Sequence, residues 1–147
     1  MDLSAADWVN LSQTEALLAQ KGPPLYIAAQ HGCVAAVRMM TEVGAYLEVR
    51  GGGNQRPLHA AAAGGHATIV AILVNAGCEI DAQDDDGNTP LIAAILHGQT
   101  APVELLLAVG ACVDIARVDG LTAVDLAELP GTPQSIRELI GMSVDRL

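Results

Sequence analysis

Short apolar segments separated by glycine-containing turns follow one another along this chain, and the segment after Thr89 shows the pattern most clearly. Leu91, Ala94 and Ile95 recur at three- and four-residue spacing, which predicts a helix with one apolar face that ends at Gly98. A second apolar stripe between positions 103 and 107 predicts another helix before the next glycine. The pattern therefore indicates pairs of short helices joined by tight turns.

The pattern returns at a fixed spacing of 33 residues. Three sets of equivalent positions show it: Pro24, Pro57, Pro90 and Ala123; Leu25, Leu58, Leu91 and Val124; Ala28, Ala61, Ala94 and Ala127. A constant period in this range predicts a stack of supersecondary units rather than one globular core. Such stacks mostly bind other macromolecules, so the period also favours a binding role.

Two six-residue segments resemble the Thr-Pro-Leu-His-x-Ala motif of the ankyrin repeat family. They are Thr89-Pro90-Leu91-Ile92-Ala93-Ala94 and Arg56-Pro57-Leu58-His59-Ala60-Ala61. With further matches at Gly65-His66 and Ile69-Val70, the resemblance covers about residues 18–140. It implies an all-α solenoid of about four helix-turn-helix units with β-hairpin fingers and a helical N-terminal cap.

The period divides the chain into one repeat domain spanning residues 1–147. We assign residues 1–21 to an N-terminal cap, and the units to 22–50, 51–83, 84–116 and 117–147, the last including a C-terminal cap. In the cap, the only tryptophan, Trp8, is expected to pack against the stack. The glycine-rich tip at 51–54 should be flexible. The last helix, near 135–140, should be short, and residues 141–147 should fray.

The composition and net charge of the chain limit the kinds of partner that it can be expected to bind. Hydrophobic residues make up 51% of the chain, but aromatics only 2%, so the core must be aliphatic. The formal net charge of −10 disfavours nucleic acid and anionic membranes and favours a protein partner with a basic or basic-amphipathic surface. The sequence shows no signal peptide, no membrane-spanning run and three cysteines without metal-ligand spacing. We expect a cytoplasmic monomer, with the nucleus as an alternative location.

The histidines and carboxylates offer no catalytic or metal site. For His59 and His66 the resemblance implies a structural role, in which the ring nitrogens tie turns and neighbouring units together. His31 and His97 lie two units apart and cannot share a metal. The acidic run at 84–86 lacks the ligand spacing of a calcium loop and is either a solvated turn or a contact for a basic partner. We therefore expect neither enzyme activity nor a cofactor.

The resemblance implies that a partner contacts the fingers and the groove lined by the first helix of each unit. The binding candidates are Gln30, His31, Arg50, Gln55, Gln83, Asp85, Asp86, Asn88, Leu96, His97, Val118, Asp119, Leu121 and Leu129. Four of them, Leu96, Val118, Leu121 and Leu129, are apolar, and they either form an exposed patch beside the aspartates or are covered by the C-terminal cap.

The expected function is that of a protein-binding module or adaptor. An inhibitory or regulatory subunit that blocks an enzyme is an alternative with the same fold. A metal-binding or catalytic protein is a remote alternative, because no nucleophile, base and acid fall within one local geometry.

Overall fold

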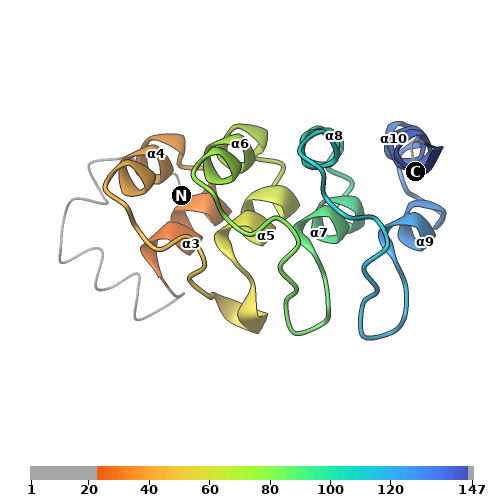
Figure 1. Ribbon diagram of the computed structural model, residues 1–147, viewed down its shortest axis with the longest axis horizontal. Helices are drawn as coiled ribbons and strands as arrows, with labels where there is room; N and C mark the ends of the chain where they lie inside the picture. The colour runs from red at the N-terminus through yellow and green to blue at the C-terminus, as the bar shows by residue number, and fades with distance from the viewer. Residues whose placement is uncertain (1–22, 146–147) are drawn as a thin grey trace.

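The computed structural model describes residues 23–145, which form consecutive pairs of helices (Figure 1). The first helices of the pairs are α3 (Pro24–His31), α5 (Pro57–Ala63), α7 (Pro90–Leu96) and α9 (Ala123–Ala127). The second helices are α4 (Val34–Glu42), α6 (Ala67–Asn75), α8 (Thr100–Ala108) and α10 (Gln134–Asp145). Each helix packs against its partner and against the equivalent helix of the next pair. The predicted helical stack is confirmed, with an inner layer of first helices and an outer layer of second helices.

Proline and threonine set where the inner helices begin. Pro24, Pro57 and Pro90 stand at the first positions of α3, α5 and α7, where a helix has no partner for a backbone N–H. In α9, which lacks this proline, the Asp125 N–H donates to the Thr122 hydroxyl, and the Thr122 N–H donates to the Asp125 carboxylate at 3.0 Å. The local sequence therefore fixes the start of every inner helix.

Alanine at one repeat position lets the inner helices lie close together. The four equivalent residues are all fully buried: Ala28, Ala61, Ala94 and Ala127. Aliphatic side chains from both layers fill the space between them, including Leu58, Ile69, Leu91 and Leu106. Burial of each such large side chain contributes about 1.5–3 kcal/mol. The core is thus continuous along the stack and is built without phenylalanine.

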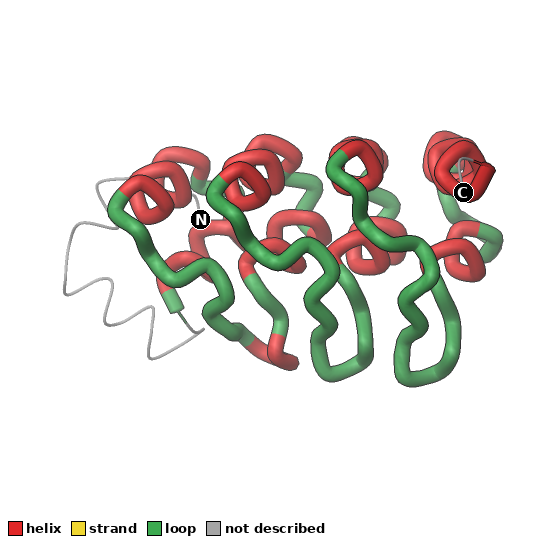
Figure 2. The backbone as a smooth tube through the Cα atoms, viewed as in Figure 1, coloured by secondary structure: helices red, strands yellow, loops and turns green. Residues whose placement is uncertain are grey.

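Three loops join one pair to the next and project from the inner layer as fingers (Figure 2). We call residues 43–56 the first finger, 76–89 the second and 109–122 the third. No β-strand occurs within residues 23–145, so the fingers are loops rather than the β-hairpins that the resemblance implied. In each finger a backbone hydrogen bond spans the tip: the N–H groups of Gly51, Asp84 and Arg117 donate to the carbonyls of Gln55, Asn88 and Leu121. A β-ladder needs alternating bonds along both arms, and these are not formed.

Each finger tip is bonded to the next one. The Asp85 N–H donates to the Gly53 carbonyl at 2.9 Å, and the Val118 N–H donates to the Asp86 carbonyl at 3.1 Å, one repeat further on. The glycine-rich tip of the first finger, expected to be flexible, forms a short 3₁₀ turn, η1 (Gly52–Asn54), within this row. The fingers therefore form a connected edge rather than three independent loops.

The two ends of the chain differ in how far the structure describes them. The predicted N-terminal cap at 1–21, with Trp8, lies outside the described residues. At the other end the prediction of a short last helix was wrong, because α10 extends from Gln134 to Asp145. Gly141 does not adopt a positive φ, so it does not end the helix. Ile136 and Ile140 are buried, and α10 packs on both α8 and α9.

Candidate functional site

His59 serves the fold rather than a ligand. Its ring is fully buried; Nδ1 accepts a hydrogen bond from the Arg56 N–H at 3.0 Å, and Nε2 donates to the Asn88 carbonyl at 2.7 Å. Burial lowers the pKa of His59 below its usual range, which keeps the ring neutral. The bond to Asn88 crosses from α5 to the second finger, so the structural interpretation of this histidine is confirmed.

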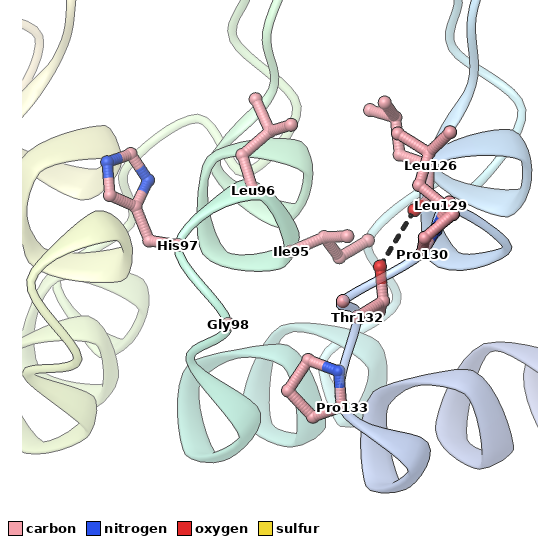
Figure 3. A pocket seen from close by; sticks show the side chains of 10 residues that line it. Ile95, Leu96, His97, Gly98, Leu126, Leu129, Pro130, Thr132 and Pro133 are labelled. Carbon is pink, nitrogen blue, oxygen red and sulfur yellow. Dashed lines mark hydrogen bonds between the residues drawn. The ribbon is translucent and has the colours of Figure 1, made fainter.

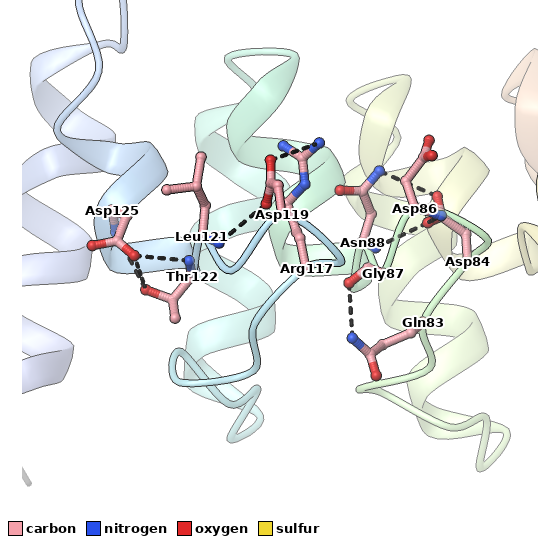
Figure 4. A network of polar contacts seen from close by, with 10 residues as sticks. All are labelled: Gln83, Asp84, Asp86, Gly87, Asn88, Arg117, Asp119, Leu121, Thr122 and Asp125. Atoms are coloured by element: carbon pink, nitrogen blue, oxygen red, sulfur yellow. Dashed lines mark hydrogen bonds and ion pairs between the residues drawn. The ribbon is translucent and has the colours of Figure 1, made fainter.

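The second finger is held by the carboxylate of Asp84 (Figure 4). One oxygen accepts from the backbone N–H groups of Asp86 and Asn88 at 2.9 Å each, and the other accepts from the Asn88 side-chain amide at 3.3 Å. Asp84 and Asn88 are both buried. Asn88 therefore stabilises the loop instead of facing a partner, and we leave it out of the proposed surface. The Gln83 side chain is also engaged, with carbonyls of the second and third fingers.

Tyr26 was missed by the sequence analysis. It occupies the repeat position of His59, and its hydroxyl donates to the Gln55 side chain at 3.1 Å, as His59 donates to the next finger. Burial raises the pKa of Tyr26, so the phenol keeps its proton. The 33-residue period could have found this contact, because residues 26 and 55 have the same separation as 59 and 88.

His66 also links neighbouring units. Its Nε2 lies 3.3 Å from the Gln30 carbonyl, and one repeat later the Gln99 amide donates to the Ala63 carbonyl at 3.1 Å. These two side chains join the starts of α6 and α8 to the ends of α3 and α5, which are the inner helices of the preceding units. His66 is thus structural, and the side chain of Gln30 stays exposed.

The inner face carries an apolar groove between α7 and α9 (Figure 3). This groove has a volume of about 380 Å³, with Ile95 and Leu126 among its buried lining residues. Leu96 and Leu129 also line it and are 45% and 44% exposed. The structure therefore brings two predicted apolar candidates together, and the C-terminal unit does not cover them.

A second groove on the inner face lies along α3 and α5, and we call it the polar groove because tyrosine, glutamine and histidine side chains contribute to its lining. It has a volume of about 290 Å³, and its lining includes Tyr26, Gln30, Gln55 and His97. His97 lines the apolar groove as well, so it marks the boundary between the two. Its Nδ1 lies 2.9 Å from the carbonyl of Ala93 one helical turn earlier, which fixes the ring. His31, another predicted groove residue, is half-buried at the end of α3 and lines neither groove.

The finger tips carry the remaining candidates. Asp85, Asp86 and Asp119 are exposed, as is Arg50 on the first finger. On the third finger Val118 and Leu121 are 76% and 37% exposed, and Asp119 forms an ion pair with Arg117 at 3.6 Å. The tips thus offer carboxylates beside apolar side chains.

Within residues 23–145 neither the cysteines nor the metal-ligating side chains form a reactive or metal-binding group. Cys33, Cys78 and Cys112 form no disulfide, and burial raises the pKa of Cys78 to about 12, which keeps it an unreactive thiol. Within residues 23–145 no three histidine, cysteine or carboxylate side chains are grouped to hold a metal ion.

Comparison with known proteins agrees with this geometry. A family model described as ankyrin repeats, in three copies, matches residues 5–84, 25–119 and 58–146. No curated protein matches the chain significantly. No helix in the described range 23–145 has the length and apolar character needed to cross a membrane.

Proposed function

Because this chain belongs to the ankyrin repeat family, whose members typically are protein–protein interaction modules and usually not enzymes, we propose that it binds a protein segment on its inner face. The bound segment lies in the apolar groove and extends beneath the finger tips. Its contacts are aliphatic at Leu96 and Leu129, polar at Gln30 and Gln55, and ionic at the aspartates of the fingers.

The observation that carries this proposal is the exposure of Leu96 and Leu129 in one groove. Two large apolar side chains on opposite walls lose contact with water when a partner side chain fills the space between them. The buried Ile95 and Leu126 give the groove a rigid floor. The groove therefore suits an aliphatic anchor residue of the partner.

The exposed carboxylates on the finger tips indicate which charge a partner should carry. Asp85, Asp86 and Asp119 are exposed carboxylates, and the chain carries a net charge of −10. This arrangement attracts lysine and arginine and repels acidic segments. A basic-amphipathic segment with an aliphatic anchor is the partner chemistry that fits both features.

A random peptide library displayed on phage tests the proposal with the intact chain as bait. We expect the enriched peptides to combine an aliphatic residue with several lysines or arginines. Leu96→Ala or Leu129→Ala should weaken binding of an enriched peptide by about tenfold, because each removes part of the anchor site.

Val43→Ala is the matched control, because Val43 is an exposed apolar residue outside both inner-face grooves. Its peptide affinity should equal that of the wild type, and circular dichroism should show unchanged helix content for all three variants. Enrichment of acidic peptides, or equal weakening by Val43→Ala, would contradict the proposal. Capturing the cellular partner and assaying its activity with and without this chain separates an adaptor from an inhibitor.

A further inference from the structure

The outer layer carries a second apolar surface, on the side of the stack away from the apolar and polar grooves. One groove, of about 390 Å³, lies between α6 and α8 and is lined by Ala67, Ala101, Glu104, Leu105 and Ala108. Another, of about 210 Å³, lies between α8 and α10 and is lined by Glu104, Leu107, Ala108, Leu139, Met142 and Ser143. We call the two together the outer face. Because Glu104 and Ala108 line both grooves, the grooves flank α8 at the same level.

Among the side chains that line these two grooves, only Glu104 is charged, and the exposed Glu138 of α10 lines neither groove. Helix α6 contains no charged residue, and α8 contains only Glu104, which is exposed. Within residues 23–145 the Glu104 carboxylate has no hydrogen-bonding or ion-pair partner. The arginine of α10, Arg137, instead donates to the Leu129 carbonyl at 3.1 Å. A lone carboxylate between two apolar grooves is the electrostatic complement of one basic group on an otherwise aliphatic partner.

We propose that the outer face binds an α-helix of another protein that crosses α8 and carries one lysine or arginine between two aliphatic residues. Neighbouring helices pack about 8–10 Å apart, so the grooves on the two sides of α8 are separated by about that distance. Seven residues of a helix span about 10.5 Å. Aliphatic side chains at positions i and i+7 therefore reach both grooves, and a basic side chain at i+3 lies over Glu104.

The small residues of α8 permit this approach. Ala101 and Ala108 are exposed one turn before and one turn after Glu104, so the backbone of a crossing helix can come close to α8 there. Leu105 on one side and Leu139 and Met142 on the other then contact the two aliphatic anchors. The outer face should therefore select a partner helix both by the spacing of its two aliphatic residues and by the basic residue between them.

A second copy of this chain is a poorer occupant. In a two-fold symmetric dimer centred on α8, the two Glu104 carboxylates would face each other without a cation. The net charge of −10 on each chain adds further repulsion. The occupant is therefore a different chain with a basic residue at the contact.

The test uses an alanine-based helical peptide of about 20 residues with leucine at i and i+7 and a single lysine at i+3. A control peptide has the same composition, with its lysine moved to the opposite face of the helix, so the net charge is equal. Each is titrated into the full-length ¹⁵N-labelled chain and followed by its amide spectrum. We expect shifts in α6, α8 and α10, and about fivefold tighter binding of the first peptide.

The variant Glu104→Gln removes the carboxylate charge but keeps the size of the side chain. Its amide spectrum, recorded without peptide, checks that the fold is intact. The two peptides should then bind this variant equally. The proposal is overturned by equal binding of both peptides to the wild type, by shifts confined to the inner face or fingers, or by no shifts at about 1 mM peptide. Concentration-dependent dimerisation with shifts in α8 would identify a second copy as the occupant and would also overturn it. Leu129→Ala should leave outer-face binding unchanged, so this result is independent of the proposed inner-face function.

Discussion

The second and third fingers share one backbone outline but differ in what their side chains do (Figure 4). Both tips are closed by a backbone bond across five residues. In the second finger the buried side chains of Asp84 and Asn88 bond to each other and to their own backbone. The equivalent positions of the third finger hold Arg117 and Leu121, and Leu121 is exposed. The same repeat position thus stabilises the loop in the second finger and leaves an apolar side chain exposed in the third.

The difference follows from the neighbours of each finger. The second finger accepts a hydrogen bond from His59 at the Asn88 carbonyl on one side, and its Asp86 carbonyl accepts one from the Val118 N–H of the third finger on the other. Within residues 23–145, no later finger follows the third. Side chains there need not satisfy a neighbour, so apolar residues such as Val118 can stay exposed. Exposed apolar side chains therefore occur on the finger that has fewer internal contacts to make.

The largest expected effect comes from Gly87→Ala. Gly87 has φ +82°, and a methyl group there would lie 2.8 Å from the Val118 nitrogen and 2.9 Å from the Arg117 Cα. Left-handed strain and the backbone clash together should lower the free energy of unfolding by about 3 kcal/mol. Gly120→Ala is the matched control at the equivalent position, with φ +88° and no atom in reach, and should cost about 1 kcal/mol. If urea unfolding showed equal losses of stability for the two variants, the close packing between the second and third fingers would be absent.

Asp84→Ala should have the next largest effect. It leaves the buried amide groups of Asn88 and the partly buried backbone N–H of Asp86 without their acceptor and should cost about 2 kcal/mol. Arg117→Ala, at the equivalent position, removes a solvent-accessible ion pair and should cost about 0.5 kcal/mol. The two variants are compared by urea unfolding at one pH. A cost for Arg117→Ala as large as that for Asp84→Ala would remove the proposed distinction between the fingers.

Acid should destabilise the chain through His59. Its pKa is lowered in the folded protein from an ordinary value of 6.5, so the unfolded chain takes up the proton first as the pH falls. The free energy of unfolding should therefore be constant above that value. Below it, the free energy should fall by up to about 1.4 kcal/mol per pH unit until the folded-state pKa is passed.

His59→Gln should be less stable at neutral pH but should lack this slope in the range just below pH 6.5. Urea unfolding at a series of pH values measures both proteins. His97→Gln is the control on the inner face, and it should keep the slope of the wild type, because His97 is exposed. A slope that persists in His59→Gln would assign the acid sensitivity to other groups.

The smallest effect is expected for Val118→Ser at the third finger. Val118 is 76% exposed, so the substitution should change the free energy of unfolding by less than about 0.5 kcal/mol. Its effect should appear instead as weaker binding of a peptide selected on the wild-type chain. A stability loss above about 1 kcal/mol would mean that the third finger has a structural role like that of the second.

The period of 33 predicted the helix pairs and their order, because each inner helix carries its own start signal and apolar stripe. The start signal is a proline in α3, α5 and α7 and a threonine–aspartate capping pair in α9. It also predicted that Leu96 and Leu129 are equivalent positions on one face. It did not predict that α10 continues through Gly141, since a glycine ends a helix only when its backbone turns to positive φ. That choice depends on what the helix packs against, here α8 and α9.

The sequence by itself determined a stack of helix pairs with an acidic, aliphatic character, because capping, periodicity and charge are local or additive properties. Only the tertiary structure decided which repeated residues remain accessible. Asn88 and Leu121 occupy the same repeat position. Asn88 is buried and hydrogen-bonded to Asp84, whereas Leu121 is exposed. Exposure depends on contacts between units, and a pattern within one unit cannot encode those contacts.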